Sequence, residues 1–151
     1  MRTFQKLSEL AALVGQEVAV SDWIIVSQHQ VDLFAEATGD HQWIHVDVDR
    51  AKAGPFGAPI AHGFLTLSLL PKFFESALHV VETRMGVNYG LNRVRFTAPV
   101  PVGSRLRAHL KLLACETIAD DGYQMTWGVT VEREGSEKPV CVAESLTRRY
   151  P

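Results

Sequence analysis

Residues 60–78 read IAHGFLTLSLLPKFFESAL, and this stretch decides the fold. From Phe64 to about Leu78 the residues are apolar nearly all round, apart from a few polar positions. A helix of this kind belongs at the centre of a domain, wrapped by other elements, because it has no polar face to show to solvent. Pro71 is expected to kink this helix or to begin a second piece, because proline cannot continue the hydrogen bonding of a helix interior.

After Arg84 the period of the apolar residues changes from helical to two, which indicates β-strands. Turn signals at 99–103, 120–122 and 134–136 separate the alternating runs. The clearest run alternates Leu106, Ala108, Leu110 and Leu112 with Arg105, Arg107, His109 and Lys111. This pattern predicts an antiparallel meander with one polar and one apolar face. An apolar helix followed by such strands predicts an α+β fold in which residues 1–151 form a single domain, with the sheet curled around the helix.

Composition excludes several classes of protein. The chain has 151 residues, of which 46% are hydrophobic and 21% charged, and its formal net charge is −2. This balance argues against a general affinity for nucleic acid or for an anionic membrane. The longest apolar run, Phe64 to Leu70, is too short for a membrane span, and the N-terminus lacks the apolar core of a signal peptide. We therefore expect a cytoplasmic enzyme or binding protein.

A second helix is expected just before residue 40. Ser27 and Gln30 have the spacing of a capping box, and Gly39 suits the left-handed position that ends a helix. Asp40 and His45 should then lie on a loop that leaves a rigid element. Such loops commonly present reactive side chains to a cleft.

An acid and an imidazole in one cleft can hold a water molecule between them. The carboxylate of Asp40 would take a proton from the water, while the imidazole of His45 orients the water or supplies a proton elsewhere. The N–H of Gly63, at the start of the apolar helix, would stabilise an oxyanion such as an enolate. Together these groups suggest hydration of an α,β-unsaturated carbonyl compound.

Simpler interpretations of the same residues exist. An aspartate after a helix-ending glycine is more often a turn former than a catalyst, and His62 has the position of a helix-entry or packing residue. A metal site at Asp40, His41 and His45 would need a helix to bring both imidazoles to one side, and Gly39 argues against that helix. From the residues alone, a turn, a catalytic pair and a metal site all stay open.

The chain resembles the MaoC-like dehydratases, and specifically the (R)-specific enoyl-CoA hydratases. Their signature begins with an aromatic residue and, a few residues later, Gly-Asp. There follow x-Asn-Pro, an aliphatic residue and His, and then, after five further residues, a small residue. The matching residues, in order and with the same spacing, are Phe34, Thr38, Gly39, Asp40, Ile44, His45 and Ala51. The stretches 61–63, 93–96 and 99–106 also look like that family, so the resemblance covers almost the whole chain.

The resemblance implies a hot-dog fold, in which a long helix is enclosed by a curved antiparallel sheet, and a homodimer whose two sheets join. It implies that Asp40 and His45 activate water for addition across an enoyl thioester, and that the Gly63 amide donates to the thioester oxygen. The product would be an (R)-3-hydroxyacyl-CoA, with the reverse dehydration also catalysed. No metal or redox cofactor is implied, because coenzyme A arrives as part of the substrate.

The chain departs from the signature at Gln42-Trp43, where the family has Asn-Pro. Gln42 could still make an orienting hydrogen bond through its side chain, and Trp43 could pack against the acyl path or the dimer partner; His62 is a further candidate for substrate binding or loop orientation. A hot-dog thioesterase and a non-catalytic acyl-thioester binding module are the alternative functions. The carrier is also open, since Arg93, Arg95, Arg105 and Arg107 could meet coenzyme A phosphates or an acyl carrier protein, or simply form a solvated edge.

Overall fold

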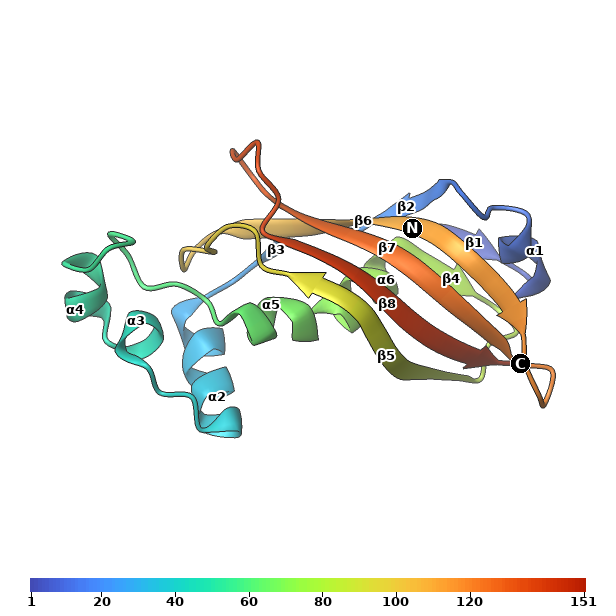
Figure 1. Ribbon diagram of the computed structural model, residues 1–151, viewed down its shortest axis with the longest axis horizontal. Coiled ribbons are helices and arrows are strands. Elements are labelled where there is room, and N and C mark those ends of the chain that lie inside the picture. Colours follow the sequence, from blue (N-terminus) through green and yellow to red (C-terminus); the bar gives the residue numbers. More distant parts are fainter.

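The computed structural model describes residues 1–151 (Figure 1). A curved sheet lies over the central helices, and further helices project beyond one end of the sheet. The elements, in chain order, are β1 (Arg2–Phe4), α1 (Ser8–Ala11), β2 (Glu17–Val20), β3 (Ile24–Ile25), α2 (Gln28–Thr38), α3 (Trp43–Val46), α4 (Val48–Lys52), α5 (Gly63–Ser68), α6 (Leu70–Ala77), β4 (Leu78–Val80), β5 (Met85–Arg95), β6 (Arg105–Thr117), β7 (Tyr123–Arg133) and β8 (Cys141–Tyr150).

The main sheet has six antiparallel strands in the order β2-β6-β7-β8-β5, with β3 also paired to β6. The predicted meander is confirmed for β6, β7 and β8, which follow one another in sequence and in space. It is wrong for β5, which lies beside β8 and not beside β6. The connection over residues 96–104 is longer than the roughly 2–5 residues of a hairpin loop, and this length allows β5 to reach the far edge. A separate pair, β1 and β4, is parallel.

The alternation of side chains in β6 places the core on the concave face. Leu106, Ala108, Leu110 and Leu112 are all fully buried. Trp127 of β7 extends this layer and meets Phe74 of α6 edge to face, with ring centroids 5.3 Å apart. The expected α+β arrangement, with an apolar sheet face against an apolar helix, is present.

The central helix is interrupted. It forms as two short helices, α5 and α6, which meet at Leu69, and Pro71 lies in the first turn of α6. Pro71 therefore begins a second piece, as expected, because the first turn of a helix is where a missing N–H does no harm. Phe73 is fully buried, but Phe64 is 70% exposed, so the helix is not enclosed on every side by its own chain. No helix of the structure has the length and apolar character needed to cross a membrane.

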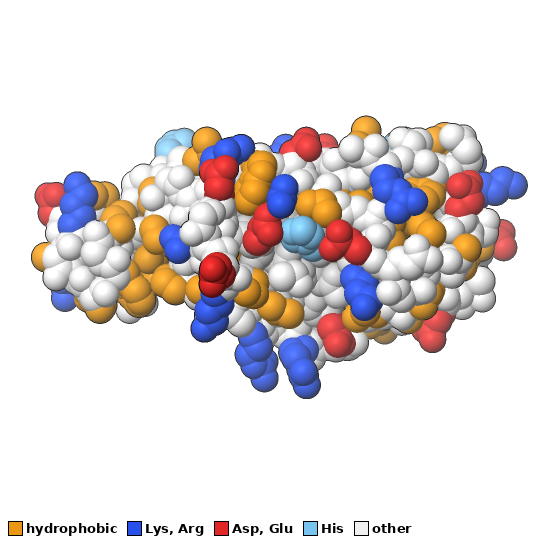
Figure 2. All heavy atoms as spheres, turned by 90° about the horizontal axis from the view of Figure 1, so that it is seen from above, with side chains coloured by type: hydrophobic (Ala, Val, Ile, Leu, Met, Phe, Trp, Pro, Cys, Tyr) orange, Lys and Arg blue, Asp and Glu red, His pale blue; other side chains and the backbone are white.

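The convex face of the sheet is polar, and Figure 2 shows acidic and basic side chains interspersed on the face seen from above. Glu132 of β7 accepts hydrogen bonds from two residues of the neighbouring strand β6. The donors are Arg107 and, at 3.1 Å, His109. His109 also contacts Glu17 at 3.1 Å. Desolvation raises the pKa of Glu132, but the hydrogen bonds from His109 and Arg107 outweigh it and hold the pKa below its ordinary value.

This network predicts a pH-dependent contribution to stability. Because the folded-state pKa of Glu132 is depressed, its contribution is fully present above the ordinary glutamate pKa of about 4.3 and is lost as the pH falls through the folded value. Glu132→Gln should lower the free energy of unfolding by about 1 kcal/mol at pH 7. In urea titrations, the difference from the unmodified protein should shrink at pH 3. An equal difference at both pH values would contradict this account.

Candidate active site

Asp40 lies directly beyond the end of helix α2, as predicted. The Ser27 side chain accepts a hydrogen bond from the N–H of Gln30 at 3.1 Å, which caps the start of the helix. Gly39 ends it with φ 79°, and its N–H donates to the carbonyl of Ala35 at 2.8 Å. This left-handed conformation favours glycine, so the chain turns sharply and Asp40 stands exposed immediately beyond the helix.

His45 does not lie on a loop, which corrects the sequence-based expectation. It belongs to the short helix α3, whose N-cap is Gln42. The N–H of Gln42 donates to Oδ1 of Asp40 at 3.3 Å, so α3 begins on the carboxylate itself. One helical turn then brings His45 back toward Asp40, and His45 is only 6% exposed.

Hydrogen bonds to main-chain carbonyls identify the protonated nitrogen of each histidine. Nδ1 of His45 lies 2.6 Å from the carbonyl oxygen of Ile60, and Nε2 of His62 lies 2.9 Å from that of Asp40. A carbonyl can only accept, so both of these nitrogens must carry the hydrogen. Neutral His45 therefore has a bare Nε2, and neutral His62 a bare Nδ1.

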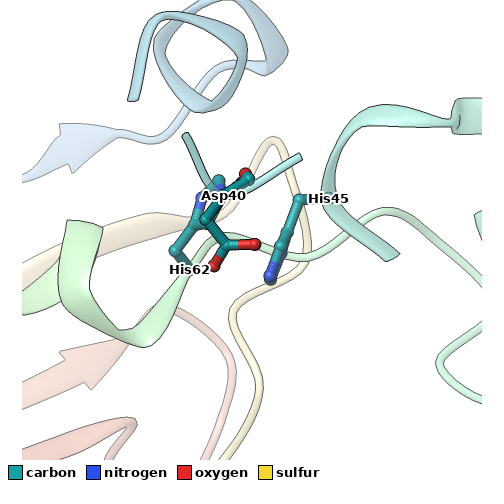
Figure 3. A group of neighbouring side chains, drawn as sticks. All are labelled: Asp40, His45 and His62. Carbon is teal, nitrogen blue, oxygen red and sulfur yellow. The ribbon is translucent and has the colours of Figure 1, made fainter. Parts of the chain in front are cut away.

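The three side chains form one cluster, drawn in Figure 3, in which nitrogen and carboxylate oxygen atoms lie within 4.8 Å of one another. The rings of His45 and His62 stack, with centroids 3.8 Å apart and an angle of 24° between their planes. Phe34 packs against the ring of His62, with centroids 4.9 Å apart. His62 thus holds both the ring of His45 and the main chain of Asp40. It comes from the entry to α5, so it links that helix to the end of α2.

Burial lowers the pKa of His45 below its ordinary value. Desolvation is the main cause, and the hydrogen bond to Ile60 opposes it; His62 lowers the pKa further, whereas Asp40 raises it. The imidazole is therefore neutral at pH 7, with Nε2 free to accept a proton.

Stacking does not favour a shared metal ion in this cluster. The lone pairs of two stacked imidazoles lie in nearly parallel planes and do not converge on one point, whereas zinc ligands surround their ion tetrahedrally. His41, which the alternative metal interpretation required, contacts Glu36 at 3.7 Å on the surface, and it is not part of the cluster.

Gly63 is the first residue of α5, with His62 as its N-cap. The main-chain N–H groups of the first turn of a helix have no partner within the helix. In α5 the first N–H groups to donate are those of Leu65 and Thr66, both to the carbonyl of His62, and the N–H of Gly63 has no acceptor in the chain. Gly63 also lines a cavity of about 370 Å³ whose walls include Ile60 and Phe96. A Cβ atom on Gly63 would lie 2.7 Å from the Phe96 ring, so the position favours glycine for its small size.

Gln42 and Trp43, the two residues that depart from the family signature, make different contacts. Gln42 contacts Asp40 through its main-chain N–H, and its exposed side chain makes no hydrogen bond. Trp43 is half-buried against α4, where the guanidinium of Arg50 lies 4.3 Å from its ring centroid. Trp43 is not among the residues that line the cavity beside Gly63.

Comparison with known proteins decides the family. The model of the MaoC like domain matches residues 9–134. The chain belongs to the MaoC-like dehydratase family. It is 55% identical to the 3-hydroxyacyl-thioester dehydratase Z of Mycobacterium tuberculosis over 98% of both chains. It is therefore an enzyme of the hydro-lyase class.

Solved structures establish the hot-dog fold. The unliganded R-hydratase PhaJ1 from Pseudomonas aeruginosa superposes with a TM-score of 0.69 at 26% identity, covering 91% of this chain and 81% of that one. An Archaeoglobus protein described as a monoamine oxidase regulatory protein superposes with a TM-score of 0.77 at 23% identity, covering 99% of this chain and 97% of that one. Within the hot-dog fold of this dehydratase, the cluster of Asp40, His45 and His62 lies where α3 meets the entry to α5.

Sequence reasoning missed two features of the site. It did not identify the carbonyl of Ile60 as the partner of His45, because main-chain acceptors leave no signal in residue types. It also treated His62 separately from the acid and imidazole pair, although the stacking joins all three. Only the proximity of His62 to Gly63 in the sequence could have indicated this.

The lowered pKa of His45 can be measured by NMR titration of its ring protons. The value should fall below about 6.5. The unfolded chain then binds more protons than the folded one in acid, so stability should fall as the pH drops from about 6.5 toward the folded value. His45→Gln should remove this part of the pH dependence. A measured pKa above the ordinary value would contradict the geometry.

Proposed function

We propose that this dehydratase adds water reversibly to a trans-2-enoyl thioester and forms the (R)-3-hydroxyacyl thioester, with coenzyme A as the carrier. The supporting observation is the pairing of the Asp40 carboxylate with a buried, neutral His45 whose bare Nε2 lies in the same cluster. The names of the relatives agree with this proposal, since one is a 3-hydroxyacyl-thioester dehydratase and another an R-hydratase.

The proposed reaction begins with a water molecule held between Asp40 and His45. Both groups accept hydrogen bonds from the water, which leaves its lone pair free to attack C3 of the substrate. As the new C–O bond forms, the C2–C3 π electrons move toward the carbonyl, and an enolate develops on the thioester oxygen. The carboxylate takes the proton of the water, and this proton is then returned to C2, so that the product contains all the atoms of the water.

The free N–H of Gly63 is the proposed donor to the enolate oxygen. It follows directly after His62 and opens into the cavity that Ile60 also lines, so the same short segment serves both the imidazole and the oxyanion. The donor is most effective in a site without competing water, and most of the cavity wall is apolar. Hydration exchanges no electrons and consumes only water, so the proposal requires no metal or redox cofactor.

The arginines considered for carrier binding fall into two groups. Arg105 and Arg107 are paired with Glu134 and Glu132, and both guanidinium groups lie over Trp23. Arg93 and Arg95 have no carboxylate partner. We therefore assign the proposed contact with coenzyme A phosphates, or with an acidic carrier protein, to Arg93 and Arg95 alone.

A homodimer joined through β5 is part of the proposal. Every residue of this edge strand except Val94 is exposed, and the strand leaves a row of main-chain donors and acceptors unpaired. Tyr89, Leu91 and the neighbouring Phe96 are apolar and exposed. An antiparallel pairing of two β5 strands would satisfy the main chain and would cover these side chains.

Replacement of the catalytic pair tests the function. Asp40→Asn and His45→Gln should each lower the rate of crotonyl-CoA hydration by about 10²–10⁴-fold, because each removes one of the groups that activate water. The rate is read from the loss of enoyl absorbance, and circular dichroism checks that both variants fold. Near-normal turnover in both folded variants would refute the mechanism.

Two further measurements separate the alternative functions. Release of free thiol from an acyl-CoA, without hydration, would identify a thioesterase. Binding of enoyl-CoA without turnover of any chain length would identify a non-catalytic acyl-thioester binding module.

The dimer can be tested with two matched variants. Leu91→Asp places a charge on the free edge, whereas Val142→Asp places one on the convex face of β8, at a residue of similar exposure (44% and 38%). By sedimentation, the unmodified protein and Val142→Asp should have about twice the chain mass of 16.7 kDa, and Leu91→Asp should shift toward the monomer. A monomeric unmodified protein, or a fully dimeric Leu91→Asp, would exclude this interface.

A further inference from the structure

Thr66 is a buried threonine whose hydroxyl has no partner. The residue is 2% exposed, and its Oγ1 makes no hydrogen bond in the chain. A hydroxyl removed from water without a compensating hydrogen bond destabilises the fold, so such groups are uncommon and need an explanation.

Other hydroxyls on the helices of this protein donate a hydrogen bond to a main-chain carbonyl three or four residues back, and Thr66 makes no such bond. Thr38 donates to the carbonyl of Phe34, four residues back, at 2.7 Å. Ser68 and Ser76 donate to carbonyls three residues back, at 2.8 and 3.1 Å. The equivalent acceptors for Thr66 are the carbonyls of His62, four residues back, and of Gly63, three residues back, and its hydroxyl is bonded to neither. The Thr66 hydroxyl is therefore turned away from the usual helical partner.

Thr66 lines the same cavity as Gly63. Thr66 follows Gly63 by three residues on α5, so the two share one face of the helix, and helical side chains lean toward the N-terminus. Thr97, whose side chain is the other polar one on the cavity wall, already donates to the carbonyl of Pro139. The Thr66 hydroxyl is thus the one side-chain donor on this wall that is still available to a ligand.

We propose that the Thr66 hydroxyl donates a second hydrogen bond to the thioester oxygen of the substrate, beside the N–H of Gly63; this assignment rests on the proposed function. The acyl part of an enoyl thioester offers one strong acceptor, its carbonyl oxygen, to an otherwise apolar cavity. As that oxygen gains charge in the enolate, a hydroxyl donor stabilises it more strongly than in the ground state. Thr66 therefore contributes to the rate more than to the binding of the substrate.

The test replaces Thr66 by valine, which keeps the shape of the side chain and removes the hydroxyl. Thr66→Val should lower kcat for crotonyl-CoA by about 10–100-fold with little change in KM, since Gly63 remains as a donor. Its melting temperature should equal or exceed that of the unmodified protein, because a buried group without a partner has been removed. Thr66→Ser, which keeps the hydroxyl, should retain kcat within a few-fold.

Thr147→Val is the matched control. Thr147 is also buried, at 8% exposure, and its hydroxyl also has no partner, but it lies on β8 and outside the cavity of Gly63. This variant should likewise have a melting temperature equal to or above that of the unmodified protein, and it should keep its kcat. Loss of activity in Thr147→Val equal to that in Thr66→Val would show a general effect of removing a hydroxyl and would overturn the assignment.

The remaining outcomes are also decisive. A kcat of Thr66→Val within twofold of the unmodified protein, or a lower melting temperature together with lower activity, would show that the hydroxyl has no role or a structural one. If Asp40→Asn and His45→Gln lose activity but Thr66→Val does not, only the Thr66 assignment fails. If Asp40→Asn and His45→Gln keep their activity, the proposed mechanism fails, whatever the result for Thr66. If the unmodified protein does not hydrate crotonyl-CoA, the proposed function itself fails.

Discussion

The hydrogen bond from Nδ1 of His45 to the carbonyl of Ile60 holds the two halves of the site together. It determines which nitrogen of His45 is bare, and therefore how the imidazole can contact water. The same segment is bound to α3 in the other direction, since the N–H of Ile60 donates to the carbonyl of Ile44 at 3.0 Å. Ala61 then donates to Val100 at 2.8 Å, which ties the site to the chain that leads into β6. The projecting helices of Figure 1 are thereby held against the sheet.

Features set by neighbouring residues could be predicted from the sequence, whereas features set by distant contacts could not. The cap at Ser27, the stop at Gly39 and the new start at Pro71 depend on local backbone chemistry, and all three are present. The position of β5 beside β8 depends on how a long connection crosses the molecule, and alternation of side chains carries no information about it. The stacking of His62 on His45 likewise joins residues 17 positions apart through packing alone.

Two buried polar atoms without partners lie at the start of α5, Nδ1 of His62 and Oγ1 of Thr66. Each lowers the stability of the isolated chain, because a buried polar group without a hydrogen bond loses its solvation. His62 is the N-cap of the helix that carries Gly63, and Thr66 lies on that helix and lines the cavity. An unpaired donor on a cavity wall is what a preorganised binding site requires, since groups already paired within the protein are not available to a ligand.

The structure also explains why the site can form without the Asn-Pro of the family signature. The hydrogen bond to the Asp40 carboxylate comes from the main-chain N–H of residue 42, which any residue except proline provides, so Gln42 leaves it intact. A proline at the next position would begin α3 with a fixed φ and no surplus N–H. Trp43 lacks that restraint, but its indole packs against Arg50 and against the main chain at Gly54, where a Cβ atom would lie 2.9 Å away. Contact between α3 and α4 thus replaces the rigidity of the proline ring, and His45 is still held in place.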